Sequence, residues 1–315
     1  MKLTRILLIL GVLISTTACS NRSSSGSDSS PEIQFLEEMV RFNPYPSNPI
    51  FSGTGGDTWD RLIRERGFIL FDEGIYKLWY SGYNMDIYDT IYLGYATSAD
   101  GVHWDRYDHN PIFDEKWTED MFVEKVDGMY YMFAEDENEE GHALVSKNGI
   151  SWKEQGLLKI FTVAGDTMPG PYGTPTIWIE QGTWYLFYER DDDAVWLAKT
   201  EDEEKLIWTN VQDEPVLKRG PGKYDRGAVA TDHIVKKDGT YYMYYHGTSS
   251  LEWLTTDSMA IWTSNVAVSD DLLHWTKYPG NPIVEGDHSS PVVLLDGDHT
   301  RLYTMHPDIC LYVSK

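Results

Sequence analysis

The chain has 315 residues, and its 26 Lys and Arg residues face 50 Asp and Glu residues, which gives a formal net charge of −24. A field of this sign repels nucleic acid and anionic lipid, so the folded protein is not expected to bind either. Aromatic residues make up 14% of the sequence, with 12 Trp and 21 Tyr. This composition suits a large core made of sheets that pack face to face.

The first eighteen residues have the order of an export signal. Two basic residues precede the apolar run LLILGVLI, and small residues follow it. The run is too short to span a bilayer as a stable helix. The junction of Ala18 and Cys19 resembles a bacterial lipoprotein signal, although Thr16 stands where that family usually has Leu. We therefore predict export, removal of residues 1–18 and lipid anchoring of Cys19 to a bacterial membrane, either the outer membrane or within the periplasm. Secretion without lipid is the alternative.

Residues 19–41 are predicted to hold the anchor, a tether and a short helix. The Ser-rich segment SNRSSSGSDSS is typical of a flexible linker, and PEIQFLEEMVRF, at 31–42, is the one helical candidate. If Cys19 carries lipid, Cys310 has no partner, so no disulfide is expected. The remaining residues, 42–315, are predicted to form a single domain, and we expect that domain to be a monomer.

A ten-residue phrase recurs five times in this domain. It reads WDRYDHNPIF from Trp104, WKEQGLLKIF from Trp152, WTNVQDEPVL from Trp208 and WTKYPGNPIV from Trp275, and FNPYPSNPIF begins at Phe42. The extra copy lies at the N-terminus, whereas the chain ends at CLYVSK without one. In a closed ring the first strand would complete the last sheet. The repeat therefore predicts a five-bladed β-propeller whose last blade combines both ends of the domain.

A second repeated phrase places the strands inside each unit. Examples are DGMYYMFA at 127–134 and DGTYYMYY at 238–245, in which Gly permits the tight turn of a hairpin. Three turn signals per unit indicate four strands, and the period-two alternation favours an all-β fold. Phrases such as YATSADGVHW, NPIF and DGTYYMYYHG resemble those of the five-bladed propeller glycosidases. This superfamily surrounds glycoside hydrolase family 43 and includes families 32, 117 and 130. The resemblance covers residues 42–315 and implies this fold and action on glycans.

Strand direction brings a set of polar residues to one end of the propeller. The inner strand of each blade begins at the funnel mouth and the second strand returns to it. Counting eight residues back from the turn glycines gives Arg66, Asp120, Thr174, Thr231 and Ser289, with Arg64, Glu65, Glu119, Asp232, His233 and His288 beside them. The returning strands end at Tyr80, Glu135, Glu189 with Arg190, His246 and His306. We predict that these residues form one sugar-binding site.

Hydrolysis of a glycosidic bond requires a proton donor and a carboxylate that activates water or attacks the sugar. The resemblance implies that Asp120 is the base, because it has the offset at which family 43 carries a catalytic aspartate. Asp232 is the predicted orienting or second carboxylate, and Glu189 or Glu65 the acid. Family 43 has its base in the first blade, where this chain has Arg66. A deep funnel would favour attack on chain ends.

Two other functions remain open at this stage. Arg64, Arg66 and Arg190 match the carboxylate of an acidic sugar, so a β-elimination on a uronate is one alternative. Its base would be His233, His246 or His306, with Tyr80 or Tyr245. The other alternative is a non-catalytic glycan-binding lipoprotein, in which Trp178 and Trp253 could stack on sugars.

No cofactor is expected from the sequence. The acid runs at 135–140, 190–193 and 201–204 are interpreted as solvated hairpin tips, because no calcium-loop pattern is present. The resemblance is compatible with a structural calcium ion on the propeller axis. No spaced set of His or Cys ligands indicates another metal site.

Overall fold

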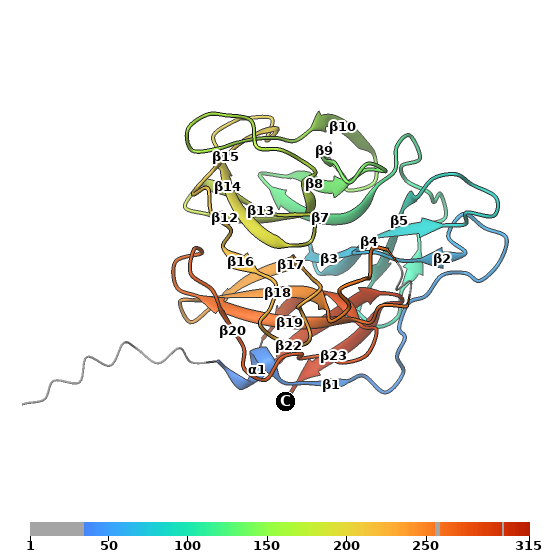
Figure 1. The fold of residues 1–315 in the computed structure, drawn as a ribbon. Coiled ribbons are helices and arrows are strands. Elements are labelled where there is room, and N and C mark those ends of the chain that lie inside the picture. The colour runs from blue at the N-terminus through green and yellow to red at the C-terminus, as the bar shows by residue number, and fades with distance from the viewer. Residues whose placement is uncertain (1–34, 256–258, 298) are drawn as a thin grey trace, which may run out of the picture. The chain divides into compact units, whose positions relative to one another are not determined.

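The computed structural model describes residues 35–255, 259–297 and 299–315 (Figure 1). Five sheets form the blades of an all-β propeller, which confirms the fold predicted from the repeat. The helix in these ranges is α1 (Glu37–Val40), which is shorter than the predicted segment 31–42. It ends because Arg41 is extended and leads into the first strand. The predicted signal, the tether and Cys19 lie outside the described residues.

Blades 1 to 4 each contain four antiparallel strands in chain order from the inside outward. Blade 1 has β3 (Phe68–Asp72), β4 (Ile75–Tyr83), β5 (Tyr92–Ser98) and β6 (Asp105–Arg106), and β2 (Leu62–Ile63) pairs with β4. Blade 2 has β7 (Glu119–Val126), β8 (Met129–Glu135), β9 (Gly141–Ser146) and β10 (Trp152–Leu157). Blade 3 has β12 (Gly173–Glu180), β13 (Thr183–Arg190), β14 (Ala194–Thr200) and β15 (Ile207–Asn210), with β11 (Lys159–Phe161) and β16 (Leu217–Lys218) added. Blade 4 has β17 (Ala228–Lys237), β18 (Thr240–Thr248), β19 (Trp262–Ser269) and β20 (Thr276–Lys277).

Blade 5 closes the ring. It consists of β21 (Ser289–Asp296), β22 (His299–His306), β23 (Cys310–Ser314) and the N-terminal strand β1 (Phe42–Pro44). Phe42 pairs with Ser314 in an antiparallel register, so the two ends of the domain share one sheet. In Figure 1 the blue β1 lies beside the red β23. The N-terminal copy of the repeat therefore completes the last blade, as predicted.

Local hydrogen bonds close the turn that comes just before the repeated phrase. Before the repeat Trp of blade 1, Asp100 Oδ1 accepts the N–H groups of Val102 and His103, each at 2.9 Å. Asn148 and Asp271 close the same turn in blades 2 and 4. Side chains of this kind compete well with backbone acceptors in turns. The turn therefore recurs wherever its sequence does.

The asparagine of the Asn-Pro pair serves a second repeated purpose. Asn48, Asn110 and Asn281 each bond both the N–H and the carbonyl group of one residue in the third strand, at 2.8 to 3.0 Å. These bonds hold the chain that leads to the next blade against the sheet. Blades 2 and 3 have Leu158 and Glu214 at this position. After Leu158 the chain instead forms β11, which pairs in parallel with β15 of the next blade.

Large aromatic side chains fill the space between blades. Trp79 and Trp208 are fully buried, and Trp79 packs edge-on against Trp152 of blade 2 at a centroid distance of 6.3 Å. Cys310 is buried with a free thiol. Within the described residues, no helix is long and apolar enough to cross a bilayer.

Candidate functional site

A cavity of about 550 Å³ opens where the inner strands begin and the second strands end. Its volume is typical of a small-ligand site. Nine of the predicted site residues line it: Arg64, Glu65, Glu119, Asp120, Glu135, Thr174, Glu189, His246 and His306. Ser289 and Trp253, which were also expected at the mouth, line it as well. The topology of the blades thus gathers side chains from all five sheets around one hollow.

Bulges at the start of the inner strands shape the floor of this cavity. The strand register shifts between Glu119 and Phe122 in β7, between Gly173 and Thr176 in β12, and between Thr231 and His233 in β17. A bulge inserts one residue and re-aims the side chains around it. Asp120 and Thr174 consequently adopt φ values of 46° and 45°. Both of their side chains line the cavity.

Arg66 lies under the floor and does not line the cavity, contrary to the expected substrate-binding role. The residue is fully buried. Its Nη1 donates to Thr176 Oγ1 at 2.7 Å and to the Thr231 carbonyl at 3.1 Å. Its Nη2 donates to the Pro175 carbonyl at 2.7 Å and to the Asp120 carbonyl. The guanidinium group therefore joins the inner strands of four blades, and its donors face the protein instead of a substrate.

His233 and Tyr80 are also held away from the cavity. His233 Nδ1 accepts the backbone N–H of Val293 at 3.0 Å, and the ring packs edge-on against Phe68. Burial lowers the pKa of His233 to about 3, so the ring is neutral. Tyr80 is buried and donates to Asp60 Oδ2 at 3.2 Å. Neither side chain is placed to act as the base or the substrate ligand that the sequence predicted.

Four further expectations fail because the side chains pack elsewhere. The Arg190 guanidinium lies over the Trp196 ring, at 5.6 Å from its centroid. The remaining three residues, which are His288, Tyr245 and Trp178, contact Tyr312, Asp225 and Tyr241 respectively. None of the four is among the residues that line the cavity.

Asp232 does not line the cavity itself, but it contacts His246, which does. Asp232 is fully buried, and its Oδ1 lies 2.9 Å from His246 Nδ1. Burial disfavours the charged imidazole, but the adjacent Asp232 carboxylate outweighs it and raises the pKa of His246 to about 9. His246 is therefore positively charged at neutral pH. His306 behaves in the opposite way, because burial and the charge of Arg64 lower its pKa to about 4.

Glu65 and Asp120 are neighbours with different environments. Asp120 Oδ1 accepts the backbone N–H of Arg66, the residue after Glu65, at 2.8 Å. Arg64 Nε lies 2.7 Å from Glu65 Oε1. Burial and the negative charge of Asp120 nevertheless raise the pKa of Glu65 to about 7. Glu65 can thus carry a proton at neutral pH beside a second carboxyl group.

Glu135 and Glu189 meet at Gly173, and Glu135 is also the cross-strand partner of Glu119, the residue before Asp120. A methyl group on Gly173 would overlap Glu189 Oε1 and lie 3.2 Å from Glu135 Oε1, so only glycine permits this approach. Glu135 accepts the backbone N–H of Thr174, and Glu189 accepts that of Asp192 at 2.6 Å. Burial and neighbouring negative charges raise the pKa of both carboxyl groups well above the usual range.

The interpretation of two acid runs as solvated tips was wrong in part. Glu135 and Glu139 of the first run and Asp192 of the second line the cavity. Burial raises the pKa of Asp192 to about 7. Their position directly at or after a returning strand was the signal that could have identified them. Aromatic and apolar residues complete the wall, and these are Tyr83, Met85, Ile91, Trp117, Leu254, Ala260 and Trp262.

Within the described ranges, no group of three or more His, Cys, Asp or Glu residues is arranged to hold a metal ion. Below the floor, the polar groups of the inner strands bind the guanidinium group of Arg66.

Comparison with known proteins supports the fold. No protein-family model matches the chain. The 1,2-beta-oligomannan phosphorylase of Thermoanaerobacter sp. (strain X514) is 23% identical over 227 residues, which are 66% of this chain and 72% of that protein. The structure of the β-1,2-mannobiose phosphorylase of Listeria innocua has a TM-score of 0.67 at 17% identity, covering 87% of this chain and 96% of the other.

A more distant structure extends the likeness to a second family. GH43B of Bacteroides ovatus has a TM-score of 0.59 at 13% identity, covering 84% of this chain and 53% of the other. Structures from glycoside hydrolase families 43 and 130 are thus both similar to this chain. The resemblance predicted from the repeated phrases is confirmed for the fold.

Proposed function

We propose that this protein is an enzyme that hydrolyses glycosidic bonds, with Asp120 as general base and Glu65 as general acid. The observation that carries the proposal is the pair itself, in which two neighbouring carboxyl groups line a sugar-sized cavity and the environment of Glu65 raises its pKa to about 7. Glycosidases need one carboxyl group that donates a proton and another that acts as a base or nucleophile. Glu189 is the second candidate for the acid, since burial also raises its pKa.

Electrostatics favour water over phosphate as the attacking group. Seven carboxyl groups line the cavity: Glu65, Glu119, Asp120, Glu135, Glu139, Glu189 and Asp192. The cations among its lining residues are Arg64, which already pairs with Glu65, and the imidazolium of His246. A phosphate dianion would lose its hydration in the cavity, and both cationic groups there already face a carboxyl group, Glu65 for Arg64 and Asp232 for His246. A water molecule does not meet this barrier.

We propose β-1,2-linked mannooligosaccharides as the substrate class, cleaved from a chain end. The support is the similarity to two proteins named for action on β-1,2-linked mannosides. A second support is the buried guanidinium of Arg66, which joins the inner strands around the axis and favours a pocket over a through-channel. A closed site of this kind suits a chain end better than a chain interior.

The experiment that tests this proposal compares two co-substrates. The purified protein is incubated with β-1,2-mannooligosaccharides in phosphate-free buffer and again with inorganic phosphate, and the products are separated. Release of mannose without phosphate is the expected result. Release of mannose 1-phosphate only when phosphate is present would replace hydrolysis with phosphorolysis. Binding without any cleavage would support the glycan-binding alternative.

The geometry gives less support to elimination on a uronate. That hypothesis depended on Arg64, Arg66 and Arg190 at the mouth, and only Arg64 lines the cavity. Of its candidate bases, the half-buried His233 is bonded to Val293 outside the cavity, and His246 is already protonated beside Asp232, so His306 is the one neutral candidate that lines the cavity. A uronate-containing oligosaccharide in the same assay, followed by the ultraviolet absorbance of an unsaturated product, gives no signal if our proposal holds.

We also propose that the protein is exported and anchored to a membrane by lipid on Cys19. The sequence of the first nineteen residues supports this location. The test is fractionation of cells that express the full chain. Wild-type protein is expected in the membrane fraction, and Cys19→Ala is expected in the soluble fraction. Equal distribution of the two proteins would contradict the anchor.

A further inference from the structure

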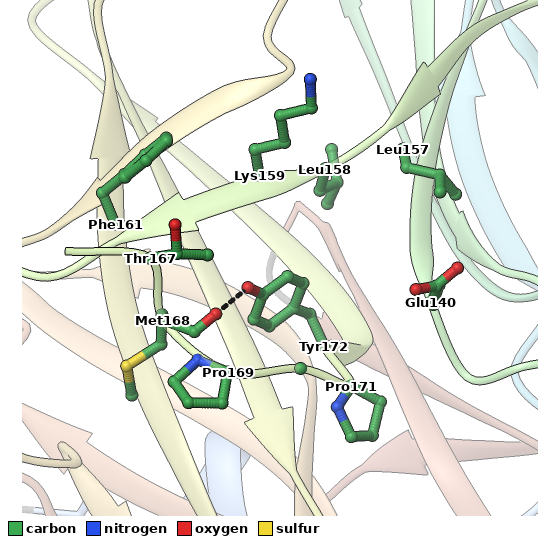
Figure 2. A pocket seen from close by; sticks show the side chains of 11 residues that line it. Glu140, Leu157, Leu158, Lys159, Phe161, Thr167, Met168, Pro169, Pro171 and Tyr172 are labelled. Atoms are coloured by element: carbon green, nitrogen blue, oxygen red, sulfur yellow. Dashed lines mark hydrogen bonds between the residues drawn. The ribbon is translucent and has the colours of Figure 1, made fainter.

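A second cavity, of about 340 Å³, lies beside the ends of β10 and β11 (Figure 2). We call it the outer groove, and it is defined by Glu140, Leu157, Lys159, Phe161, Met168 and Tyr172. We propose that the outer groove binds sugar residues of the substrate chain that are remote from the cleaved bond. This inference rests on the proposed function. The volume lies within the range of small-ligand sites.

The outer groove is adjacent to the cavity that holds Asp120. Glu139 lines that cavity, and the next residue, Glu140, lines the groove. Tyr172 lines the groove, and Thr174 lies on the cavity floor. Neighbouring Cα atoms are about 3.8 Å apart, so at these two points the wall between the sites is one or two residues thick. A glycan with one end in the cavity needs to cross only this wall.

Backbone hydrogen bonds build the groove before any ligand binds. The N–H of Leu158 donates to the Gly141 carbonyl at 2.8 Å, and the N–H of Met168 donates to the Ile160 carbonyl at 2.8 Å. The Tyr172 hydroxyl donates to the Met168 carbonyl, as the dashed line in Figure 2 shows. A preformed site loses little conformational entropy on binding. The groove can therefore contribute to the affinity for the glycan chain.

The lining suits a neutral sugar. In Figure 2 the Tyr172 ring occupies the middle of the groove, with Phe161 and Glu140 toward opposite ends. Aromatic rings offer a flat apolar surface to the C–H groups of a sugar ring. The Glu140 carboxylate can accept hydrogen bonds from hydroxyl groups and the Lys159 ammonium can donate them. Because both signs of charge are present, the groove favours a neutral ligand over an anion or a cation.

The groove also lies where the regular blade plan is interrupted. Three repeats use asparagine to bind the chain to their own blade, whereas Leu158 replaces it in blade 2. The chain then pairs β11 with blade 3 and follows a longer path to Tyr172. Departures from a regular pattern often coincide with functional sites. Here the departure creates the groove.

Chain-length dependence of the reaction tests the inference. The ratio of kcat/KM for β-1,2-mannohexaose to that for β-1,2-mannobiose is measured in wild type and in Phe161→Ala. A disaccharide is too short to occupy both sites, so the loss is expected on the hexasaccharide, and the ratio is expected to fall about three- to tenfold. Phe71→Ala is the matched control. Phe71 is an exposed phenylalanine beside the β3–β4 hairpin turn of blade 1, at the end of the propeller opposite the cavity mouth. An unchanged ratio in Phe161→Ala would overturn the proposal.

A binding measurement separates this inference from the proposed function. β-1,2-Mannohexaose is titrated calorimetrically into Asp120→Asn and into Asp120→Asn combined with Phe161→Ala or with Lys159→Ala. We expect weaker binding in both combined variants, with unchanged thermal unfolding. If wild type cleaves no glycan, the proposed function fails, and this titration still tests the groove. Equal affinity in all three proteins would show that the groove takes no part in binding.

Discussion

Carboxyl groups at the two ends of the propeller lie in opposite electrostatic environments. At the hairpin end, Asp72 accepts hydrogen bonds from Lys125 at 2.8 Å and from Lys77. Although burial opposes ionisation, these bonds hold the pKa of Asp72 well below its usual range. At the mouth, Glu135 and Glu189 meet at Gly173, and burial raises the pKa of both carboxyl groups.

The difference shows how to distinguish a structural acid from a chemical one. A carboxylate with a lysine partner has its charge balanced and holds two segments together. A buried carboxyl group beside others of its kind retains a proton, and a perturbed pKa in a cavity marks a candidate for proton transfer. Residue type alone does not distinguish a structural acid from a chemical one. What distinguishes them is whether a cationic side chain lies close enough to balance the charge of the carboxylate.

The largest expected effect is the loss of catalytic activity when Asp120, at the mouth, is replaced. In Asp120→Asn the base can no longer accept a proton, so kcat should fall by about 10²- to 10⁴-fold with the fold intact. The measurement is mannose release, with circular dichroism as a check on folding. Asp72→Asn, the same change at the hairpin end, should retain wild-type kcat. Full activity in Asp120→Asn would remove Asp120 from the mechanism.

A large effect on stability is expected from the buried guanidinium under the floor. Arg66→Met removes the donors to Thr176, Pro175 and Thr231 and leaves buried acceptors unpaired. The free energy of unfolding should fall by about 3–5 kcal/mol, as measured in urea. Arg64→Met, at a half-exposed side chain, should change it by less than about 1 kcal/mol. Similar losses in both variants would contradict the bridging role of Arg66.

A smaller and more specific effect concerns the pH dependence of the reaction. Glu65 must be protonated to act as the acid, and its pKa is about 7. The value of kcat should therefore fall as the pH rises through that region, because the proton is lost. Glu65→Gln should be slower at every pH and lack this decline. A wild-type kcat that stays constant to high pH would exclude Glu65 and direct attention to Glu189.

The smallest expected effect is at the hairpin end. Asp72→Asn should lower the free energy of unfolding by about 1 kcal/mol at neutral pH, through the loss of pairing with Lys77 and Lys125. The folded-state pKa of Asp72 is depressed, so its contribution is fully present above the unfolded pKa of about 4 and is lost progressively as the pH falls from there through the lower folded-state pKa. Urea unfolding at neutral and acidic pH measures this change. A difference that persists in acid would contradict the pairing.

The architecture was readable from the sequence because it depends on local hydrogen bonds that recur. Asp100 and Asp271 close the same turn, and Asn110 and Asn281 bind the same place on the third strand. The copies that keep these residues therefore form the same contacts, although Asn48 of the N-terminal copy makes them with Leu311 at the other end of the domain. The count of blades and the closure by β1 follow directly from counting these copies.

The site was predictable only in outline. Strand direction correctly brought Asp120, Glu135, Glu189 and His246 to one cavity. It placed Arg66 there too, and the acid run containing Asp192 was assigned to solvent. Both errors have a local cause, because the positive φ of Glu65, at 59°, turns the chain just before Arg66, and a turn after a strand can fold over the mouth as easily as away from it.

By itself the sequence determined the number of blades, the strand order and the end of the propeller at which polar groups gather, since these follow from repeated short-range patterns. Only the tertiary structure decided which acids are paired, which retain a proton and where Arg66 directs its donors. Those properties depend on burial and on the charges of residues that are distant along the chain. The identity of the strands is thus encoded locally, and the chemistry of the cavity arises from their assembly.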